Sequence, residues 1–385
     1  MILFWVISLS FLSVNLISAE ECPTGPKIVC YYSSWAYYRQ DIGFFDTTNI
    51  DTSLCTHVVY SFVGMNLNLA VDYIDQNVDV SHGGLRNFTD LKVQNPCLKT
   101  ILAIGGWNEG SRKYSVMAST DKSREDFVES ALRFLVAFNF DGLDVDWEYP
   151  GQRGGIAEDK QNFVLLLKQM HSRFSKWDLE ISIAAPIVSS LLEEGYDVPE
   201  ISKYVNHVSL MAYDYTATTS ETVGLMAPIS EIVRKSVDLW LGKGFSQEKL
   251  ILGLPSYARS YNLKDPEEHD IGALTDGMGK AGLYTGEQGF LSYYELQRYL
   301  QTGSYETDCS NDGNCYAYYK NDWFSYDDTD TYNAKIDYAV NKGLGGIMLW
   351  TLDTDDFGGI YGKKYPLLNS IKDKLETAYR LKHSV

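Results

Sequence analysis

Short apolar runs rich in β-branched residues recur along the chain, and amphipathic stretches separate most of them. The clearest amphipathic stretch covers residues 121–138, where Phe127, Ala131 and Leu135 repeat at helical spacing and charged residues occupy the other face. The apolar runs predict eight strands, at residues 27–33, 57–63, 99–105, 140–148, 180–185, 207–214, 250–255 and 346–352. Eight strands alternating with helices predict an α/β fold, the (β/α)8 TIM barrel. An open doubly wound sheet would need a Gly-rich phosphate turn after an early strand, and the sequence has none there.

The last two predicted strands lie roughly twice as far apart as the others. A barrel unit averages about 30 residues, and the excess between them is rich in Gly, Tyr and Asp. We therefore expect residues 261–326 to form a small α+β domain inserted between the seventh strand and the seventh helix. The catalytic barrel would then comprise residues 20–260 and 327–385.

Residues 1–19 form an almost unbroken apolar run that ends in the small residues Ser18 and Ala19. Such a run directly after the initiator Met is typical of a secretory signal peptide. A membrane anchor is the alternative, because the run is nearly long enough to span a bilayer. No later segment approaches that length, so we expect a secreted, extracellular protein.

Six cysteines follow this run and fit an oxidising compartment. Six cysteines allow fifteen pairings, so the residues alone leave the pairing open, although Cys309 and Cys315 lie close together in a polar turn. Asn87 begins the sequon Asn-Phe-Thr, a candidate for N-glycosylation.

The net charge of −18 argues against nucleic acid or an anionic membrane as the partner. A neutral or weakly cationic polysaccharide meets no such objection. The 14% aromatic content includes 28 tyrosines, whose flat faces and polar edges suit sugars. The six histidines are scattered and form no HExxH or other close-spaced pair, so we expect neither a metal site nor a cofactor.

One predicted strand carries acidic residues at alternate positions, Asp144, Asp146 and Glu148. Side chains alternate along a strand, so these carboxylates share one face and the apolar residues between them share the other. The apolar face must meet the outer helices, which leaves the acidic face inside the barrel. Glu148 would lie nearest the C-terminal rim, where barrel enzymes place their active sites. Crowded carboxylates in a low-dielectric interior cannot all ionise, so one should keep the proton that glycosidic bond cleavage requires.

The pattern Asp141-x-x-Asp144-x-Asp146-x-Glu148 resembles the motif of glycoside hydrolase family 18, above all that of animal chitinases of the mammalian and secreted arthropod types. Further matching stretches, in the family's order, are CYYSSW at 30–35, LCTH at 54–57, AIGGWN at 103–108, MAYD at 211–214 and GGIMLW at 345–350. The resemblance covers nearly the whole chain after the apolar run. It implies an endo-acting chitinase that hydrolyses β-1,4 N-acetylglucosamine linkages.

The mechanism implied by the resemblance is retaining and substrate-assisted, an exception among glycosidases. It assigns Glu148 as general acid and then general base, while the 2-acetamido oxygen of the substrate attacks and closes an oxazolinium ring. Asp146 would hydrogen-bond the acetamido N–H, and Asp144 would share a proton with Asp146. Tyr213 would steady the acetamido oxygen, and Asp141 would have a structural role.

The resemblance also implies a cleft with an aromatic floor. Trp350 would lie beneath the sugar at the cleavage point, Trp35 on the non-reducing side and Trp107 on the leaving-group side. The other expected substrate contacts are Tyr31, Phe62, Gly106, Tyr149, Met211, Asp214, Tyr257, Arg259 and Glu295. The expected partner is chitin or an N-acetylglucosamine oligomer, bound by a monomer.

The sequence departs from the family pattern after residue 214. A His-Gly-x-Trp turn is common there, whereas this chain has YTATTS at 215–220, with Thr219 where the tryptophan would fall. We expect weaker leaving-group binding and less sustained sliding on crystalline chitin, because a stacking platform is worth about 1–3 kcal/mol.

The cysteines also depart from the pattern, because no cysteine follows Cys315 to bridge the inserted domain to the loop after the last strand. The resemblance directly implies the disulfide Cys30–Cys55. In place of the missing bridge it leads us to expect the local disulfide Cys309–Cys315. The two remaining cysteines would then form the disulfide Cys22–Cys97.

Two other functions remain open. A chitinase-like lectin would keep the barrel and groove, but such proteins usually lack the terminal glutamate or an adjacent aspartate, and this chain has them. An endo-N-acetylglucosaminidase acting on N-glycan cores would share the fold and the acid. The series Trp35, Trp107 and Trp350 fits a linear sugar chain better.

Overall fold

The computed structural model describes residues 22, 24–309 and 312–383, so the expected signal peptide lies outside the described residues. Eight parallel strands close into a barrel, because β1 pairs with both β2 and β15. Around the barrel the order is β1 (Lys27–Ser33), β2 (His57–Met65), β4 (Lys99–Gly105), β5 (Gly142–Asp146), β6 (Glu180–Ala185), β7 (His207–Leu210), β8 (Leu250–Pro255) and β15 (Gly346–Trp350). The predicted (β/α)8 fold is confirmed.

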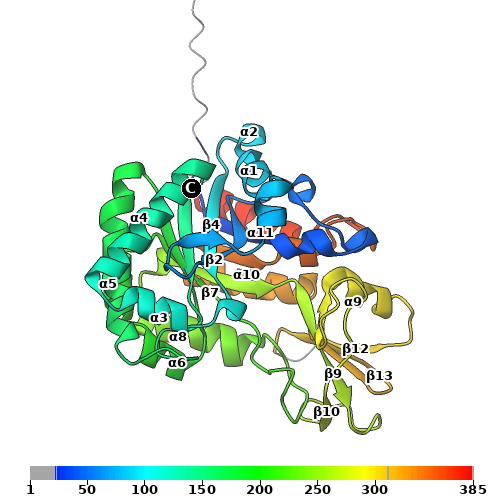
Figure 1. Ribbon diagram of the computed structural model, residues 1–385. Helices are drawn as coiled ribbons and strands as arrows, with labels where there is room; N and C mark the ends of the chain where they lie inside the picture. The colour runs from blue at the N-terminus through cyan, green and yellow to red at the C-terminus, as the bar shows by residue number, and fades with distance from the viewer. Residues whose placement is uncertain (1–21, 23, 310–311, 384–385) are drawn as a thin grey trace, which may run out of the picture.

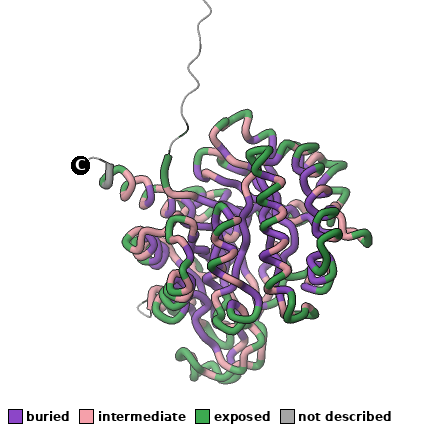
Figure 2. The backbone as a smooth tube through the Cα atoms, turned by 90° about the vertical axis from the view of Figure 1, so that its left-hand side faces the viewer, coloured by how far each residue is buried: buried purple, intermediate pink, exposed green. Residues whose placement is uncertain are grey.

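Helices cover the outside of this barrel, and the buried part of the chain runs through its centre (Figures 1 and 2). The predicted helix is α4 (Asp121–Phe138), which Thr120 caps through its side chain and Asn139 ends in the left-handed conformation. The other helices on the barrel are α1 (Gly84–Thr89), α2 (Leu91–Gln94), α3 (Arg112–Ala118), α5 (Asp159–Phe174), α6 (Ser189–Gly195), α7 (Val198–Ile201), α8 (Lys235–Gly242), α10 (Thr329–Lys342) and α11 (Pro366–His383).

Several strands end at other residues than the sequence predicted. β5, β7 and β15 end earlier, because the chain leaves the hydrogen-bonded ladder at the rim; β5 follows β4 as far as Asp146 but β6 only as far as Val145. β5 also begins two residues later than predicted, at Gly142. β2 is longer than predicted and runs to Met65, because its end pairs with the antiparallel strand β3 (Val71–Tyr73). The residues that follow β5 and β7 therefore belong to rim loops.

A second, antiparallel sheet follows β8 in the chain and lies to one side of the barrel (Figure 1). Its strands run in the order β10-β9-β14-β13-β12, and β11 pairs with the free part of β9. It begins at Tyr257, directly after Ser256, and so starts slightly earlier than the expected boundary at residue 261. The elements are β9 (Tyr257–Leu263), β10 (Thr275–Met278), β11 (Phe290–Ser292), α9 (Tyr293–Leu300), β12 (Glu306–Asp308), β13 (Cys315–Tyr319) and β14 (Asp322–Tyr326).

Disulfides join Cys22 to Cys97, Cys30 of β1 to Cys55 before β2, and Cys309 to Cys315 at the start of β13. Within the described residues, no helix has the combination of length and apolar composition that would let it cross a membrane.

Candidate active site

The acidic face of β5 and of the residues that follow it points into the barrel. Asp144, Asp146 and Glu148 are only 0%, 3% and 8% exposed. Asp144 accepts a 2.7 Å hydrogen bond from the Tyr31 hydroxyl of β1 and a 2.6 Å bond from the Ser182 hydroxyl of β6. Since β1 and β5 are not neighbours in the barrel, the bond from Tyr31 crosses the interior and fixes the direction of the acidic face.

The other face of the same segment packs against the helices. The Trp147 ring lies 5.9 Å from Tyr114 of α3 and 5.4 Å from Phe163 of α5, centre to centre. Its indole N–H donates a 2.6 Å hydrogen bond to the Ser111 hydroxyl. Trp147 is therefore a packing residue, and the acidic side chains alternate with a buried apolar set, as a strand in a closed barrel requires.

Burial raises the pKa of all three carboxyl groups, because a charge is poorly solvated there. The pKa of Asp144 is raised to about 6. The pKa of Asp146 is raised well above its ordinary value, first by burial and then by the charges of Glu148 and Asp144. Burial also raises the pKa of Glu148, while a hydrogen bond from Tyr149 and the charge of Arg153 lower it in part. The cluster can hold a proton at neutral pH.

Two residues after β7 complete this side of the site. Tyr213 is buried, and its ring lies edge-on to Tyr257 at 6.1 Å. Asp214 has a φ of 57° and accepts three hydrogen bonds, from the Tyr257 hydroxyl at 2.9 Å and from two nitrogens of Arg259 at 2.7 and 2.6 Å. The bidentate contact with Arg259 fixes the plane of the Asp214 carboxylate.

An aromatic series forms the floor next to the carboxylates. The centre of the Trp350 ring lies 5.2 Å from that of Tyr31 and 5.8 Å from that of Phe62. The Phe62 ring in turn stacks on Trp35, with 6.1 Å between the ring centres. Trp35 is 45% exposed, so one end of the series is open to solvent. Gly106 allows this packing: its φ is 82°, and a Cβ there would lie 2.7 Å from the Phe62 ring. Phe62, Trp350 and Met211 all pack on the apolar interior of the barrel.

The sequence pattern that defines the glycosyl hydrolases family 18 matches residues 27–355. The chain belongs to this family. Chitotriosidase-1 of Mus musculus is 36% identical over an alignment of 388 positions, which covers 96% of this chain and 82% of the relative. The group IV chitinase of Ostrinia furnacalis in complex with allosamidin has a TM-score of 0.90 and 37% identity, over 92% of this chain and 99% of that one. Human YKL-39, described as a pseudo-chitinase with retained chitooligosaccharide binding properties, has a TM-score of 0.83 and 31% identity, over 91% and 100%.

Arg153 is a residue of this family 18 site that the sequence analysis missed. Its guanidinium lies over Trp107, which is 58% exposed, and it donates a 3.0 Å hydrogen bond to the carbonyl of Glu148. Its position in the sequence could have indicated this role, because it lies five residues after Glu148, in a Gly-rich turn that follows the acidic strand. Its positive charge makes it part of the electrostatic environment of the acid.

Glu295, another expected site residue of this family 18 chain, is held by hydrogen bonds within the second sheet. It is 3% exposed, and both carboxylate oxygens are occupied within the second sheet. They accept backbone N–H groups of Tyr284 at 2.5 Å, Thr285 at 3.0 Å and Ser292 at 2.8 Å, and also the hydroxyls of Thr285 and Ser292. Glu295 and Ser292 form the capping box of α9. Glu295 therefore has a structural role as a cap of α9, and its expected contact with substrate stays a prediction.

Asp141 lies at the opposite end of β5 from the rim. It accepts hydrogen bonds from the backbone N–H of Thr100 at 2.8 Å, the Thr100 hydroxyl at 3.0 Å and Lys92 at 2.9 Å. These contacts join the start of β5 to β4 and α2, well away from the acidic cluster.

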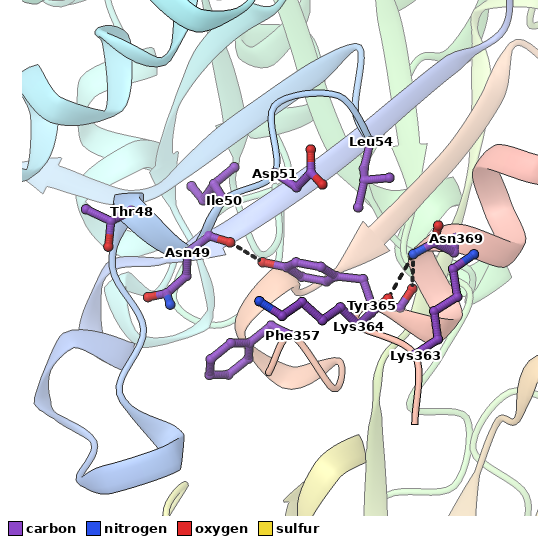
Figure 3. A pocket seen from close by; sticks show the side chains of 10 residues that line it. All are labelled: Thr48, Asn49, Ile50, Asp51, Leu54, Phe357, Lys363, Lys364, Tyr365 and Asn369. Atoms are coloured by element: carbon purple, nitrogen blue, oxygen red, sulfur yellow. Dashed lines mark hydrogen bonds between the residues drawn. The ribbon is translucent and has the colours of Figure 1, made fainter. Parts of the chain in front are cut away.

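A cavity of about 460 Å³ lies elsewhere in the described structure (Figure 3). Its lining residues are Thr48, Asn49, Ile50, Asp51, Leu54, Phe357, Lys363, Lys364, Tyr365 and Asn369. The hydroxyl of Tyr365 closes one side by donating to the carbonyl of Asn49. None of the acidic or aromatic residues of the site lines it, so it has no part in the chemistry of the acidic cluster.

Proposed function

We propose that this chain is an endo-acting chitinase that hydrolyses β-1,4 N-acetylglucosamine linkages in chitin and chitooligosaccharides. The observation that carries the proposal is Glu148, a carboxyl group that follows β5 at the rim and whose pKa is raised by burial. It shares a face with Asp144, whose hydrogen-bond donor Tyr31 contacts Trp350 of the aromatic floor. Aromatic faces bind the apolar faces of sugars, and a protonated carboxyl can protonate a glycosidic oxygen. The relatives reported above support this substrate class.

The proposed reaction has two steps and uses no protein nucleophile. Glu148 donates its proton to the glycosidic oxygen as the bond from that oxygen to the anomeric carbon breaks. The 2-acetamido oxygen of the same sugar bonds to the anomeric carbon and forms an oxazolinium ion. The Glu148 carboxylate then takes a proton from water, whose oxygen attacks the anomeric carbon, opens the ring and restores the original configuration.

The neighbours of Glu148 suit the roles that family resemblance gives them. Oδ1 of Asp146 is buried and has no hydrogen-bond partner within the described residues, so it is available to accept the acetamido N–H. Asp144, held by Tyr31, lies on the same face and can share a proton with Asp146. The buried Tyr213 hydroxyl would donate to the acetamido oxygen and so steady the attacking group.

The proposed substrate contacts come from both sides of the acidic cluster. Trp350 would stack beneath the sugar at the cleavage point, Trp35 on the non-reducing side and Trp107 on the leaving-group side. The other contacts we propose are Tyr31, Phe62, Gly106, Tyr149, Met211, Asp214, Tyr257 and Arg259.

The test is a product-length time course on the N-acetylglucosamine hexamer, comparing the native protein with Glu148→Gln. The native protein should release shorter oligomers with the β-anomer in excess at first, and it should leave the cellulose hexamer intact because that substrate has no acetamido group. Glu148→Gln should lower kcat by about 10² to 10⁴ and still bind the hexamer. Binding without turnover in the native protein would instead indicate a lectin, and release of glucose oligomers would contradict substrate assistance.

We also propose that the protein is secreted as a monomer. The disulfides fit an oxidising compartment, and Asn87, on α1, is exposed and accessible for glycosylation. Residues 1–19 would be removed as a signal peptide, and residues 261–326 would act as a domain inserted in the barrel. Mass spectrometry of the secreted protein, with and without glycosidase treatment, tests the first residue and the use of Asn87.

A further inference from the structure

Asn314 is fully buried where the second sheet meets the loop that follows β7. Its side-chain carbonyl accepts hydrogen bonds from the backbone N–H groups of Met226 at 3.1 Å and Ala227 at 3.3 Å. The Ser325 hydroxyl of β14 donates to the same oxygen at 3.0 Å and accepts from the Met226 N–H at 2.9 Å. One side chain directly before β13 thus holds two consecutive peptide groups of a barrel loop.

The amide nitrogen of Asn314 is tied to a rigid part of the fold. It donates to the carbonyl of Tyr326 at 2.7 Å and to Oδ1 of Asp327 at 3.0 Å. Asp327 is paired with Lys335 of α10 by two 2.6 Å contacts, and both side chains of this pair are fully buried. The position of Asn314 is therefore fixed from β14 and α10, independently of the loop that it holds.

The held segment continues directly to the site. The carbonyl of Met226 accepts the backbone N–H of Tyr215 at 2.9 Å, and Tyr215 follows Asp214 in the chain. Met226 and Ala227 also pack in the same buried cluster as Tyr213. A shift of Met226 would therefore also shift Tyr213, which the proposed reaction uses, and Asp214, a proposed substrate contact.

The second sheet also holds the middle of this loop. The Tyr261 hydroxyl donates to the carbonyl of Thr216 at 2.8 Å. Val223 exchanges 2.9 Å backbone hydrogen bonds with Ala273 and Gly272, next to β10. The loop is thus held at several points, and Asn314, together with Ser325, holds Met226 where the loop returns to the barrel.

We propose that Asn314 is a positioning residue, which places Tyr213 and Asp214 in the cleft by holding Met226 and, through it, Tyr215. This inference rests on the proposed chitinase function. It gives the inserted segment a role in catalysis, because the side chain that holds the loop directly precedes β13 and is not one of the proposed substrate contacts.

The test uses Asn314→Leu, which keeps the volume and removes the hydrogen bonds. The matched control is Asn95→Leu, because Asn95 also accepts a backbone N–H (Cys97, 3.1 Å) and donates to a carbonyl (Thr52, 2.7 Å), but before β4, at the far end of the barrel from the rim. For the N-acetylglucosamine tetramer, Asn314→Leu should lower kcat/KM by about tenfold, mainly through KM, and the control should change it by less than about twofold. Equal effects of both variants, after correction for the folded fraction, would overturn the proposal.

Double substitution with Asp214→Asn separates positioning from general stability. If Asn314 acts through Asp214, Asn314→Leu should lower kcat/KM much less in the Asp214→Asn protein than in the native one. Full additivity of the two effects would overturn the inference. The affinity of each protein for the tetramer is measured in parallel by tryptophan fluorescence, so that the two proposals can fail separately. A native protein that does not hydrolyse the tetramer would refute the proposed function. In that case the inference is judged by binding alone, and an unchanged Kd in Asn314→Leu would refute it.

Discussion

The guanidinium carbon of Arg153 lies 3.6 Å from the centre of the Trp107 ring, over its face. A cation over an indole is attracted by the negative face of the ring. The contact holds the positive charge of Arg153 near Glu148, to whose carbonyl Arg153 also donates a hydrogen bond. Arg153 therefore contacts Trp107, a proposed sugar-stacking residue, and also affects the pKa of Glu148, the proposed acid.

Removing this charge should change the pH dependence of hydrolysis. Glu148 must be protonated to act, so activity is lost as pH rises through its pKa. Arg153 lowers that pKa, so Arg153→Gln should raise it and move the alkaline limb of kcat/KM to higher pH. Arg153→Lys, which keeps the charge, is the control and should leave the limb closer to its native position. The measurement is kcat/KM for the tetramer as a function of pH. If the alkaline limb of Arg153→Gln stays at its native pH, Arg153 does not lower the pKa of Glu148.

The hydrogen bond between Tyr31 and Asp144 should matter for chemistry more than for folding. Tyr31→Phe removes a donor that lowers the pKa of Asp144, so that pKa should rise and kcat should fall by about tenfold. Tyr60→Phe is the matched control, because Tyr60 of β2 is equally buried and donates a bond of the same 2.7 Å length, to Asp79 outside the site. Both variants should lose about 1–3 kcal/mol of stability. A loss of kcat in both, or in neither, would show that the bond has no special role in the site.

Asp355 should make the protein less stable as pH rises. Burial raises the pKa of this fully buried group from 3.8 to about 7, against the hydrogen bonds from backbone N–H groups such as that of Leu368. A raised folded pKa stabilises the protein below the unfolded pKa, and this stability is lost as pH rises through the folded value. The free energy of unfolding should therefore fall by at most about 4 kcal/mol between about pH 4 and pH 8. Urea unfolding across this range should give a flatter dependence for Asp355→Asn, and parallel curves would exclude the effect.

The barrel could be predicted because side chains along each strand alternate between its inner and outer faces, so apolar and polar residues repeat every second position. Asp144 and Asp146 alternate with Val145, and a closed barrel has only an inside and an outside, so the apolar set determines where the acidic set points. The strand ends were less predictable. Asp214 belongs to a rim loop, because the chain leaves the ladder where tertiary contacts such as the one with Arg259 take over.

Tertiary contacts also explain what the sequence did not predict in the site. Arg153 reaches Trp107 across a turn whose path depends on residues far away in the chain, so no local pattern pairs them. Asn314 and Met226 are separated by 88 positions, and a lone asparagine has no periodic signal. Glu295, in contrast, was readable: Ser292 lies three residues before it, at the spacing of a capping box.

The capping role of Glu295 gives a direct prediction. Glu295→Gln keeps the shape but loses the charge that attracts several backbone N–H groups. The protein should lose about 1–3 kcal/mol of stability, while KM for the tetramer should change by less than about twofold. Thermal unfolding and tetramer kinetics test the two parts separately. A large rise in KM with unchanged stability would instead show that Glu295 contacts the substrate.

The rim loop after Asp214 offers a gain of function. Thr219 occupies the position where relatives commonly have a tryptophan, and it is exposed. Thr219→Trp should add a stacking surface on the leaving-group side, worth about 1–3 kcal/mol of sugar binding. KM for the hexamer should fall, and more products should be released per encounter with insoluble chitin.

A large exposed ring can also adsorb to chitin without any subsite, so Thr219→Trp needs a control on the same loop. Ala217 is exposed two positions earlier, and Ala217→Trp adds the same ring there. Nonspecific adsorption would increase binding to insoluble chitin in both variants and leave hexamer KM unchanged. A true subsite should lower hexamer KM in Thr219→Trp alone, because only a correctly placed ring can stack on a sugar whose neighbour is held at Trp350. Identical kinetics of the two variants would mean that the loop does not border the leaving-group side.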